Sequence, residues 1–221
     1  MTPGEPAKRP LNTSARLMVL TIILISGSAC SELPYDSWYL GFGSPNYMEA
    51  WIETADVVDV RGQTFYRAMS GTTSINTPPN NLGRPHGWPS NPGWGAGKNV
   101  TGADLPKIIY VRWKSYADSR TYEVFITLND EQRQAMLKGE KAYCAWRNTW
   151  IISYLKGVVI GLAPGGIAKA WLAGPCIESM EIGRFTGRVV KAGPDAGQPS
   201  PRLRPESRTY IEQYGIPYDS W

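Results

Sequence analysis

The sequence predicts a mainly β fold: an antiparallel sheet or sandwich-like single domain with one or two short helices and a long loop rich in Pro, Gly and Trp. Apolar and polar residues alternate with a period of two in several short segments, as in half-buried strands. Turn-forming Gly, Pro and Asn separate these segments. Only two short stretches carry a helical pattern. The composition, 42% hydrophobic and 19% charged, is that of an ordinary globular protein.

The first residues, 1–29, are predicted to be a signal peptide. Lys8, Arg9 and Arg16 precede an apolar stretch at 17–25, and small residues follow it. A basic head, a short apolar core and small residues before a cleavage site are typical of a secretory signal. The apolar core is far shorter than the ~18 to 20 residues that a membrane-spanning helix needs.

The residues around Cys30 resemble a bacterial lipobox, in which cleavage would leave Cys30 as the first residue with a diacylated thiol. Gly27 stands where the lipobox usually has leucine, and Ser31, in place of aspartate, resembles an outer-membrane address. We therefore expect a protein anchored by lipid on Cys30 to the outer membrane of a Gram-negative bacterium, on the periplasmic side. The alternative is a plain secretory peptide followed by a chance cysteine.

The first strands are predicted at 39–42 and 47–54, separated by a turn. In the second of them Glu49 and Glu53 alternate with apolar residues, so we expect both carboxylates to face solvent. A hairpin is predicted over 57–69.

That hairpin turns at Gly62, and a second hairpin pairs 109–114 with 121–127, because apolar and polar residues alternate in both segments. A short helix is predicted over 130–138. Asn129 can cap its start and Gln132 can complete the capping box, so the helix is well defined although mostly polar.

The most apolar stretch of the chain runs from 150 to 172. The segments 150–162 and 167–172 are predicted to form a hairpin at the centre of a sheet, because Pro164 and Gly165 suit the central positions of a type II turn. The last strand is predicted at 185–190.

Four parts of the chain follow from this reading. The signal peptide is followed by a β-rich lipoprotein domain at 30–191. A Pro/Gly linker occupies 192–205, and the C-terminal tail, 206–221, contains a short helix at 206–214.

Residues 70–106 are predicted to form the long loop, because closely spaced Pro and Gly prevent a long regular element. A loop of this length in a compact domain is usually functional or disordered, and its tryptophans argue against full disorder. The Gly- and Lys-containing stretch 93–98 is not a phosphate-binding loop, because Pro92 and Asn99 stand where that motif needs Gly and Ser or Thr. We expect a flexible surface loop there.

The charge and the cysteines limit the function. The net charge is +4; Lys8, Arg9 and Arg16 against Glu5 account for +2 of it, which leaves about +2 and predicts no nucleic-acid partner. Beyond Cys30 the chain has two cysteines, an even pair in an oxidising compartment, and we expect a disulfide worth ~3 kcal/mol. The alternative is two buried thiols. Their spacing does not suit zinc, and we expect no metal and no cofactor. The pair is Cys144 and Cys176.

The string Pro-Tyr-Asp-Ser-Trp occurs at 34–38 and again at 217–221. Each copy could pack in a similar aromatic slot, or the second could compete with the first, locally or by a domain swap. Chance is the third explanation.

Residues for catalysis are few. His86 is the single histidine, so a hydrolase would have to use it, and the chain has no Gly-x-Ser-x-Gly elbow. We therefore expect a protein that is not an enzyme. Aromatic residues near turns are the stronger functional signal, because Trp and Tyr are enriched in binding hot spots. We expect partner contacts from His86, Trp88, Trp94 and Tyr116, with core packing as the alternative for each aromatic.

Several segments together carry a family signature: LGFGSPNYMEAW at 40–51, GADLPK at 102–107 running into YVRW at 110–113, and GLAPGG at 161–166 with Trp171. Their combination resembles the DUF2931 family of bacterial lipoproteins, over most of residues 36–190. The family has no assigned function and brings no catalytic residues. The resemblance implies a lipoprotein of the Gram-negative envelope. By analogy, small periplasmic lipoproteins of this type often resemble immunity partners of secreted lipase effectors.

Three functions remain open. The first is a non-enzymatic periplasmic lipoprotein, anchored to the outer membrane, that presents the loop 70–106 to an envelope protein partner, such as the secreted phospholipase effector against which an immunity protein would act. The second is a structural or assembly factor of the envelope that binds glycan or other lipoproteins. The third is a hydrolase that uses His86.

Overall fold

A computed structural model describes Met1 and the ranges 33–79, 87–88, 91–191 and 203–221. The chain divides into two units, Met1–Glu32 and Leu33–Trp221. Several predicted features lie outside the described residues: the signal peptide apart from Met1, the lipidation site Cys30, the histidine His86 and most of the linker. None of the described helices is long and apolar enough to cross a membrane.

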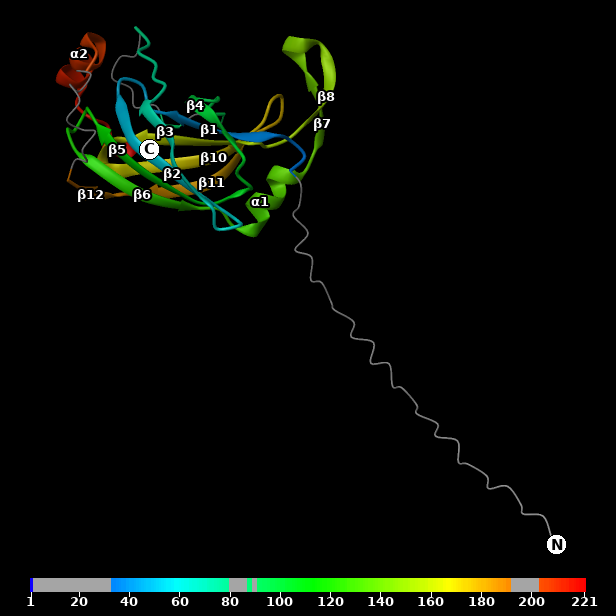
Figure 1. Cartoon of the computed structure of the whole chain (residues 1–221). Helices are drawn as coiled ribbons and strands as arrows, with labels where there is room; N and C mark the ends of the chain where they lie inside the picture. Colours follow the sequence, from blue (N-terminus) through cyan, green and yellow to red (C-terminus); the bar gives the residue numbers. More distant parts are fainter. Residues whose placement is uncertain (2–32, 80–86, 89–90, 192–202) are drawn as a thin grey trace. The chain divides into compact units, whose positions relative to one another are not determined.

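The second unit, Leu33–Trp221, contains a five-stranded sheet with the order β11-β10-β9-β1-β4 (Figure 1). Its strands are β1 (Ser37–Gly43), β4 (Ala96–Thr101), β9 (Gly157–Ala163), β10 (Ile167–Ala173) and β11 (Met180–Thr186). All neighbours pair antiparallel except β1 and β9, which are parallel, with Phe42 opposite Ile160. We call this sheet A.

The other five-stranded sheet, sheet B, has the order β12-β6-β5-β2-β3 and is antiparallel throughout. Its strands are β2 (Ala50–Asp59), β3 (Thr64–Thr72), β5 (Pro106–Ser115), β6 (Thr121–Thr127) and β12 (Arg188–Val190).

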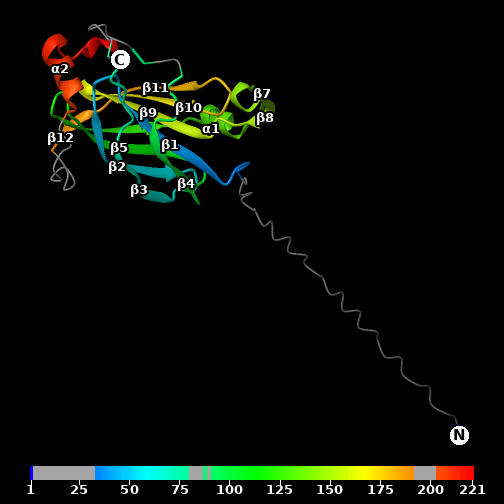
Figure 2. The same ribbon diagram turned by 90° about the horizontal axis from the view of Figure 1, so that it is seen from above.

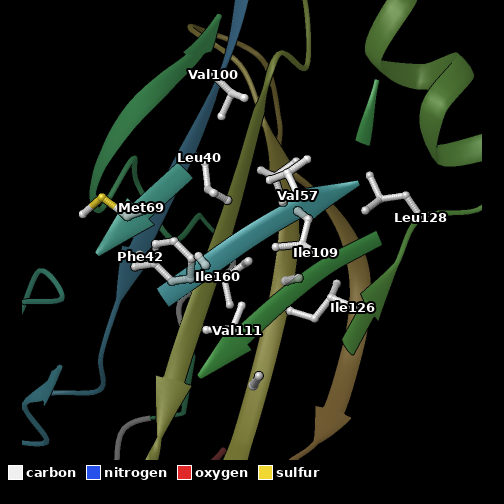
Figure 3. Packing of buried hydrophobic residues seen from close by; sticks show 14 of the residues in the cluster. Leu40, Phe42, Val57, Met69, Val100, Ile109, Val111, Ile126, Leu128 and Ile160 are labelled. Carbon is white, nitrogen blue, oxygen red and sulfur yellow. The ribbon is translucent and has the colours of Figure 1, made fainter. Parts of the chain in front are cut away.

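The main core lies between the inner faces of the two sheets. Leu40 and Phe42 of β1 and Ile160 of β9 meet Val57, Ile109 and Ile126 of sheet B, and all six side chains are fully buried (Figure 3). Two sheets that pack their apolar faces together form a sandwich. The predicted mainly β, sandwich-like fold is therefore confirmed.

Two predicted turns are confirmed by their backbone angles. Gly62 turns the β2–β3 hairpin with φ of 80°. Gly165 joins β9 to β10 with φ 77° and ψ 5°, the values of the third position of a type II turn. The resulting β9–β10 hairpin lies in the middle of sheet A, as predicted.

The prediction of a structureless segment through residue 106 is wrong at its end. Residues 96–101 form β4, which pairs with β1 and places Lys98 opposite Leu40. A Cβ at Gly97 would lie 2.0 Å from the carbonyl oxygen of Leu40, so glycine is required by the close approach of the two strands. The second half of the predicted flexible loop at 93–98 is therefore part of an edge strand.

Helix α1 (Asp130–Leu137) has the predicted capping box. The side chain of Asn129 accepts a hydrogen bond from the backbone N–H of Gln132 at 2.8 Å, and the Gln132 side chain accepts one from the backbone N–H of Asn129 at 2.9 Å. Met136 is fully buried against the main core, so the helix covers one end of the sandwich.

Strands β7 (Glu140–Cys144) and β8 (Thr149–Ser153) pair only with each other. They form a two-stranded ribbon that extends from the sandwich beside α1 (Figures 1 and 2). A short 3-10 turn, η1 (Ala145–Arg147), forms its tip. The predicted disulfide is present: Cys144 at the end of β7 is bonded to Cys176, with the two Cα atoms 5.2 Å apart.

The other end of the sandwich is covered by α2 (Pro205–Tyr214) and the C-terminal residues, which include the 3-10 turn η4 (Tyr218–Ser220). A second apolar cluster forms there: the rings of Tyr47 and Tyr210 are stacked with centroids 4.2 Å apart, and Trp221 is buried beside them. Figures 1 and 2 show α2 and the ribbon at opposite ends of this unit.

The expectation that Glu49 and Glu53 face solvent is wrong, because both are buried. Glu49 accepts a hydrogen bond from the hydroxyl of Ser207, in α2, at 2.8 Å. Glu53 lies 4.0 Å from the guanidinium of Arg112, in β5. The alternating pattern directed both side chains away from the main core, but Ser207 of α2 contacts Glu49 and Arg112 of the neighbouring strand lies close to Glu53.

Candidate functional site

The outer face of β9 is built to receive aromatic rings. Residues 157, 159 and 161 point away from the main core, and two of them are glycine. A Cβ at Gly157 would lie 2.6 Å from the ring of Trp94, and a Cβ at Gly161 would lie 2.5 Å from the ring of Trp88. The two indoles therefore lie directly on the strand backbone, at positions that tolerate no larger residue.

Trp94 is held at one end of this face by contacts with β1. Its ring meets that of Tyr39 edge-on, with centroids 5.5 Å apart. The hydroxyl of Tyr39 donates a hydrogen bond to the carbonyl of Gly95 at 3.2 Å. These contacts fix the chain where it enters β4, and the indole of Trp94 remains exposed at its edge.

Trp88 is held further along by Trp171 of β10. The rings meet edge-on with centroids 5.7 Å apart, and Trp171 is paired with Val159 of β9. The indole N–H of Trp88 is buried and has no acceptor among the described residues. A buried donor without a partner costs about 1–3 kcal/mol, so an incoming acceptor would be favoured there.

A cavity of about 440 Å³ lies on this face. Its base consists of β9 and β10 residues, and its walls come from the segments around β1 and β3 and from the chain before β4. The described lining residues are Gly43, Ser44, Pro45, Asn46, Ser74, Asn76, Gly87, Trp88, Pro92, Gly95, Val159, Gly161 and Trp171.

The described lining of this cavity is suited to binding. None of the described residues that line it has a side chain that could act as a general acid, base or nucleophile of the usual kinds except the hydroxyls of Ser44 and Ser74. The Ser44 hydroxyl is 2.5 Å from that of Thr73, not from a base. The lining combines aromatic surface with amide and hydroxyl groups, which is typical of sites that bind apolar groups with a few oriented hydrogen bonds.

The predicted partner-binding residues divide between two places. Trp88 and Trp94 are brought together on the outer face of β9, and Trp88 lines the cavity. Tyr116 lies in the β5–β6 turn, where its backbone N–H donates to the carbonyl of Glu49. Burial and the charge of Glu49 raise the pKa of Tyr116 to about 12, so the phenol stays neutral. His86 lies outside the described residues.

The sequence predicted this strand but not its part in the site. Gly157, Val159 and Gly161 were read only as part of an apolar run, although glycines four residues apart in a strand share a face. That spacing, next to two tryptophans in a Gly/Pro-rich segment, is the signal that would have indicated aromatic packing on the strand.

Sheet B has a charged cluster on its outer face. Glu123 accepts hydrogen bonds from the hydroxyl of Tyr110 at 2.7 Å and from Nε of Arg188 at 2.6 Å. The hydrogen bond from Tyr110 and the nearby guanidinium groups lower the pKa of Glu123, although its burial opposes them. Burial and Glu123 raise the pKa of Tyr110 to about 12. Glu123, Tyr110 and Arg188 are thus held together by hydrogen bonds, which is typical of a structural ion-pair network.

No group of three or more His, Cys, Asp or Glu side chains in the described part of the chain is arranged to hold a metal ion. The described residues from Leu33 onward form a β-sandwich with an aromatic cavity on one outer face.

The chain belongs to the DUF2931 family. That family, described as "Protein of unknown function (DUF2931)", matches residues 16–219, so the resemblance noted in the sequence is confirmed. No curated protein and no solved structure matches the chain.

Proposed function

We propose that this chain is a non-enzymatic lipoprotein of the periplasm, anchored to the outer membrane through Cys30, that binds a protein partner at the cavity on the outer face of β9. The observation that carries the proposal is the lining of this cavity: aromatic and amide side chains over a glycine-containing strand, without an acid–base group among its described residues.

Rigid aromatic walls suit protein recognition. Trp88 is held between Gly161 and Trp171, so little conformational entropy is lost when a partner contacts it. A cavity of about 440 Å³ accommodates one or two large side chains of a partner. The indole N–H of Trp88 has no acceptor among the described residues and offers one oriented hydrogen bond to such a segment.

The anchor is supported by the N-terminal sequence. Basic residues, an apolar stretch at 17–25 and small residues lead to Cys30. The disulfide between Cys144 and Cys176 is consistent with an oxidising compartment, where such bonds persist. A Cys30→Ser variant should lose incorporation of labelled palmitate that the wild type shows, and equal labelling of the two would contradict the anchor.

The partner we put forward first is a secreted phospholipase effector, to which this chain would act as an immunity protein. This choice comes from the analogy with small periplasmic lipoproteins, and the cavity supports only the broader proposal of a protein ligand.

A substitution that fills the cavity tests the proposal without removing a packed side chain. Ser74 is an exposed residue of the cavity wall, and Ser74→Trp should reduce the amount of partner captured from periplasmic extract by at least roughly tenfold. Thr127→Trp places the same side chain at an exposed position of β6, in sheet B, and should capture the partner as the wild type does.

Three results would contradict the proposal. Equal capture by Ser74→Trp and wild type would exclude the cavity as the binding site. Retention by peptidoglycan, or by assembly machinery, in place of a single partner would favour the envelope-factor alternative. Hydrolysis of a phospholipid or glycan that His86→Ala abolishes would favour the hydrolase.

A further inference from the structure

The β7–β8 ribbon exposes an apolar face. In its register Tyr143 is opposite Trp150 and Lys141 is opposite Ile152, so these four residues share one face. The exposed fractions are 47% for Tyr143, 61% for Trp150 and 60% for Ile152. The opposite face carries Cys144, which is fully buried and bonded to Cys176.

Both faces of the ribbon carry apolar residues. Ala142 and Ile151 are paired on the face of Cys144 and are half-buried, whereas Tyr143, Trp150 and Ile152 on the other face are exposed. At the tip Trp146 is 71% exposed, the highest value among the described tryptophans. Trp94 lies nearby, because Trp94 and Trp146 line the same shallow pocket beside Cys176.

Cationic side chains lie against two of these aromatic rings. The Nζ atom of Lys141 lies 5.3 Å from the centre of the Trp150 ring, and the guanidinium carbon of Arg147 lies 4.4 Å from that of Trp146. Between residues 138 and 156 the chain has four Lys or Arg residues and one acidic residue, Glu140. Trp and Tyr with adjacent Lys and Arg are the residues enriched where proteins meet the headgroup region of a membrane.

The base of the ribbon adjoins the start of the described domain. Tyr154, just after β8, meets the ring of Tyr35 edge-on with centroids 5.7 Å apart. The hydroxyl of Tyr35 donates to the carbonyl of Met136, at the end of α1. Tyr35, two residues after Leu33, is therefore at the base of the ribbon.

The segment between Cys30 and Leu33 is short, so a lipid on Cys30 would keep the start of the domain close to a membrane. Leu33 is three positions after Cys30, and a fully extended chain of three residue steps spans at most roughly 11 Å. A strand of the ribbon, with five residues, is about 17 Å long. A lipid on Cys30 would therefore hold the bilayer surface no farther from Leu33 than the ribbon is long.

We propose that the exposed aromatic face of the β7–β8 ribbon binds the headgroup region of an anionic phospholipid bilayer and so orients the domain on the membrane. The proposal rests on the lipid anchor of the proposed function. It adds a second contact, one that fixes which side of the domain faces the periplasm.

Quenching of tryptophan fluorescence by lipids with brominated acyl chains tests the proposal directly. The probe is the full chain, as isolated from membranes, in vesicles of phosphatidylethanolamine and phosphatidylglycerol. We expect quenching of the wild type, and a loss of most of that quenching in a Trp146→Phe/Trp150→Phe double variant, which keeps apolar rings but removes the two fluorophores closest to the bilayer.

A second pair of variants measures the energetic effect. Trp146→Ser/Trp150→Ser should lower the affinity of the chain for these vesicles on the order of tenfold. Tyr66→Ser/Phe125→Ser removes two exposed aromatics of sheet B and should leave affinity unchanged. Circular dichroism checks that all variants are folded.

The outcomes separate this proposal from the anchor. If the wild type floats with vesicles but its tryptophans are not quenched, the result supports the anchor and contradicts ribbon binding. Ribbon-dependent quenching that persists in Cys30→Ser supports ribbon binding without the anchor, and palmitate labelling of the wild type then tests the anchor separately. Loss of partner capture in Trp146→Ser/Trp150→Ser, with vesicle affinity unchanged, would show that the ribbon binds protein and not lipid.

Discussion

At the scale of single residues, the cavity depends on glycines that place indole rings on a strand backbone. A Cβ at Gly161 would lie 2.5 Å from Trp88, so Gly161→Ala must displace that ring or bend the strand. We expect it to lower the free energy of unfolding by about 1–3 kcal/mol, the usual cost of overpacking. Gly43→Ala is the matched control, because its Cβ would have nothing nearer than 3.9 Å.

Urea unfolding followed by tryptophan fluorescence measures both variants. A similar stability for Gly161→Ala and Gly43→Ala would mean that Trp88 can move away without cost, and that the cavity wall is less rigid than the contacts imply.

Another residue-scale prediction concerns acid stability. Tyr110, Arg188 and Arg112 hold the pKa of Glu123 below its ordinary value of 4.5. A carboxyl whose pKa is lower in the folded than in the unfolded state stabilises the fold above the unfolded pKa, and this contribution is lost as the pH falls through the folded pKa. Glu123→Gln should therefore cost about 2 kcal/mol at pH 7, and the difference from wild type should shrink below pH 4.5.

Unfolding by urea at a series of pH values measures this difference. Glu178→Gln, at an exposed position, should follow the wild type at every pH. A penalty for Glu123→Gln that stays constant into acid would show that its hydrogen-bond geometry, not its charge, stabilises sheet B.

At the scale of elements, the disulfide fixes the ribbon to the sandwich. Because β7 and β8 pair only with each other, Cys144–Cys176 is the covalent connection that holds the end of β7 in place. We expect Cys144→Ser/Cys176→Ser to lower the free energy of unfolding by about 3 kcal/mol. It should also make residues 140–153 the first site of proteolysis, while the circular dichroism of the sandwich is retained. Cleavage elsewhere first would contradict this role.

Elements whose pattern is local could be predicted from the sequence. The alternation at 109–114 and 121–127, the capping residues Asn129 and Gln132, and the turn at Gly165 each specify their structure through neighbours in the chain. Strand β4 could not be predicted in this way, because its Ala, Gly, Lys and Asn form no alternating pattern. It is a strand because it pairs with β1, from which more than fifty residues separate it.

The candidate site was predicted only in part, because it too depends on contacts between residues that are distant in the sequence. Aromatic residues near turns drew attention to Trp88 and Trp94, but the strand beneath them is distant in sequence. The burial of Glu49 was missed because its partner, Ser207, is 158 residues away. The apolar residues of β8 were expected to lie at a sheet centre, and the structure exposes Trp150 and Ile152.

At the scale of the whole domain, the two copies of Pro-Tyr-Asp-Ser-Trp have different structural positions. Trp38 of the first copy is buried in the main core, and its indole donates to the carbonyl of Asp104. Trp221 of the second copy lies in the second apolar cluster and donates to the carbonyl of Pro164. Each tryptophan is buried with its N–H satisfied by a backbone carbonyl, so each copy has a site of its own.

The C-terminal copy should therefore stabilise the fold without exchanging with the first. Arg184 donates two hydrogen bonds, at 2.9 and 3.1 Å, to the main-chain oxygen of Trp221, which fixes this segment on β11. We expect Trp221→Ala to lower the free energy of unfolding by about 3–5 kcal/mol, as for other buried aromatics. Tyr218→Ala, at a half-exposed residue of the same turn, should cost less than about 1 kcal/mol.

Sedimentation of a variant that lacks residues 216–221 tests the exchange itself. If the two copies swap between chains, the deletion should shift the wild-type distribution from dimer to monomer. If each copy occupies its own site, the distribution should be the same for both proteins, and only stability should fall. We expect the second result. Trp38 fills a position between the two sheets. The Trp221 segment is bonded to Arg184 and Pro164 on the opposite side of sheet A and does not reach that position.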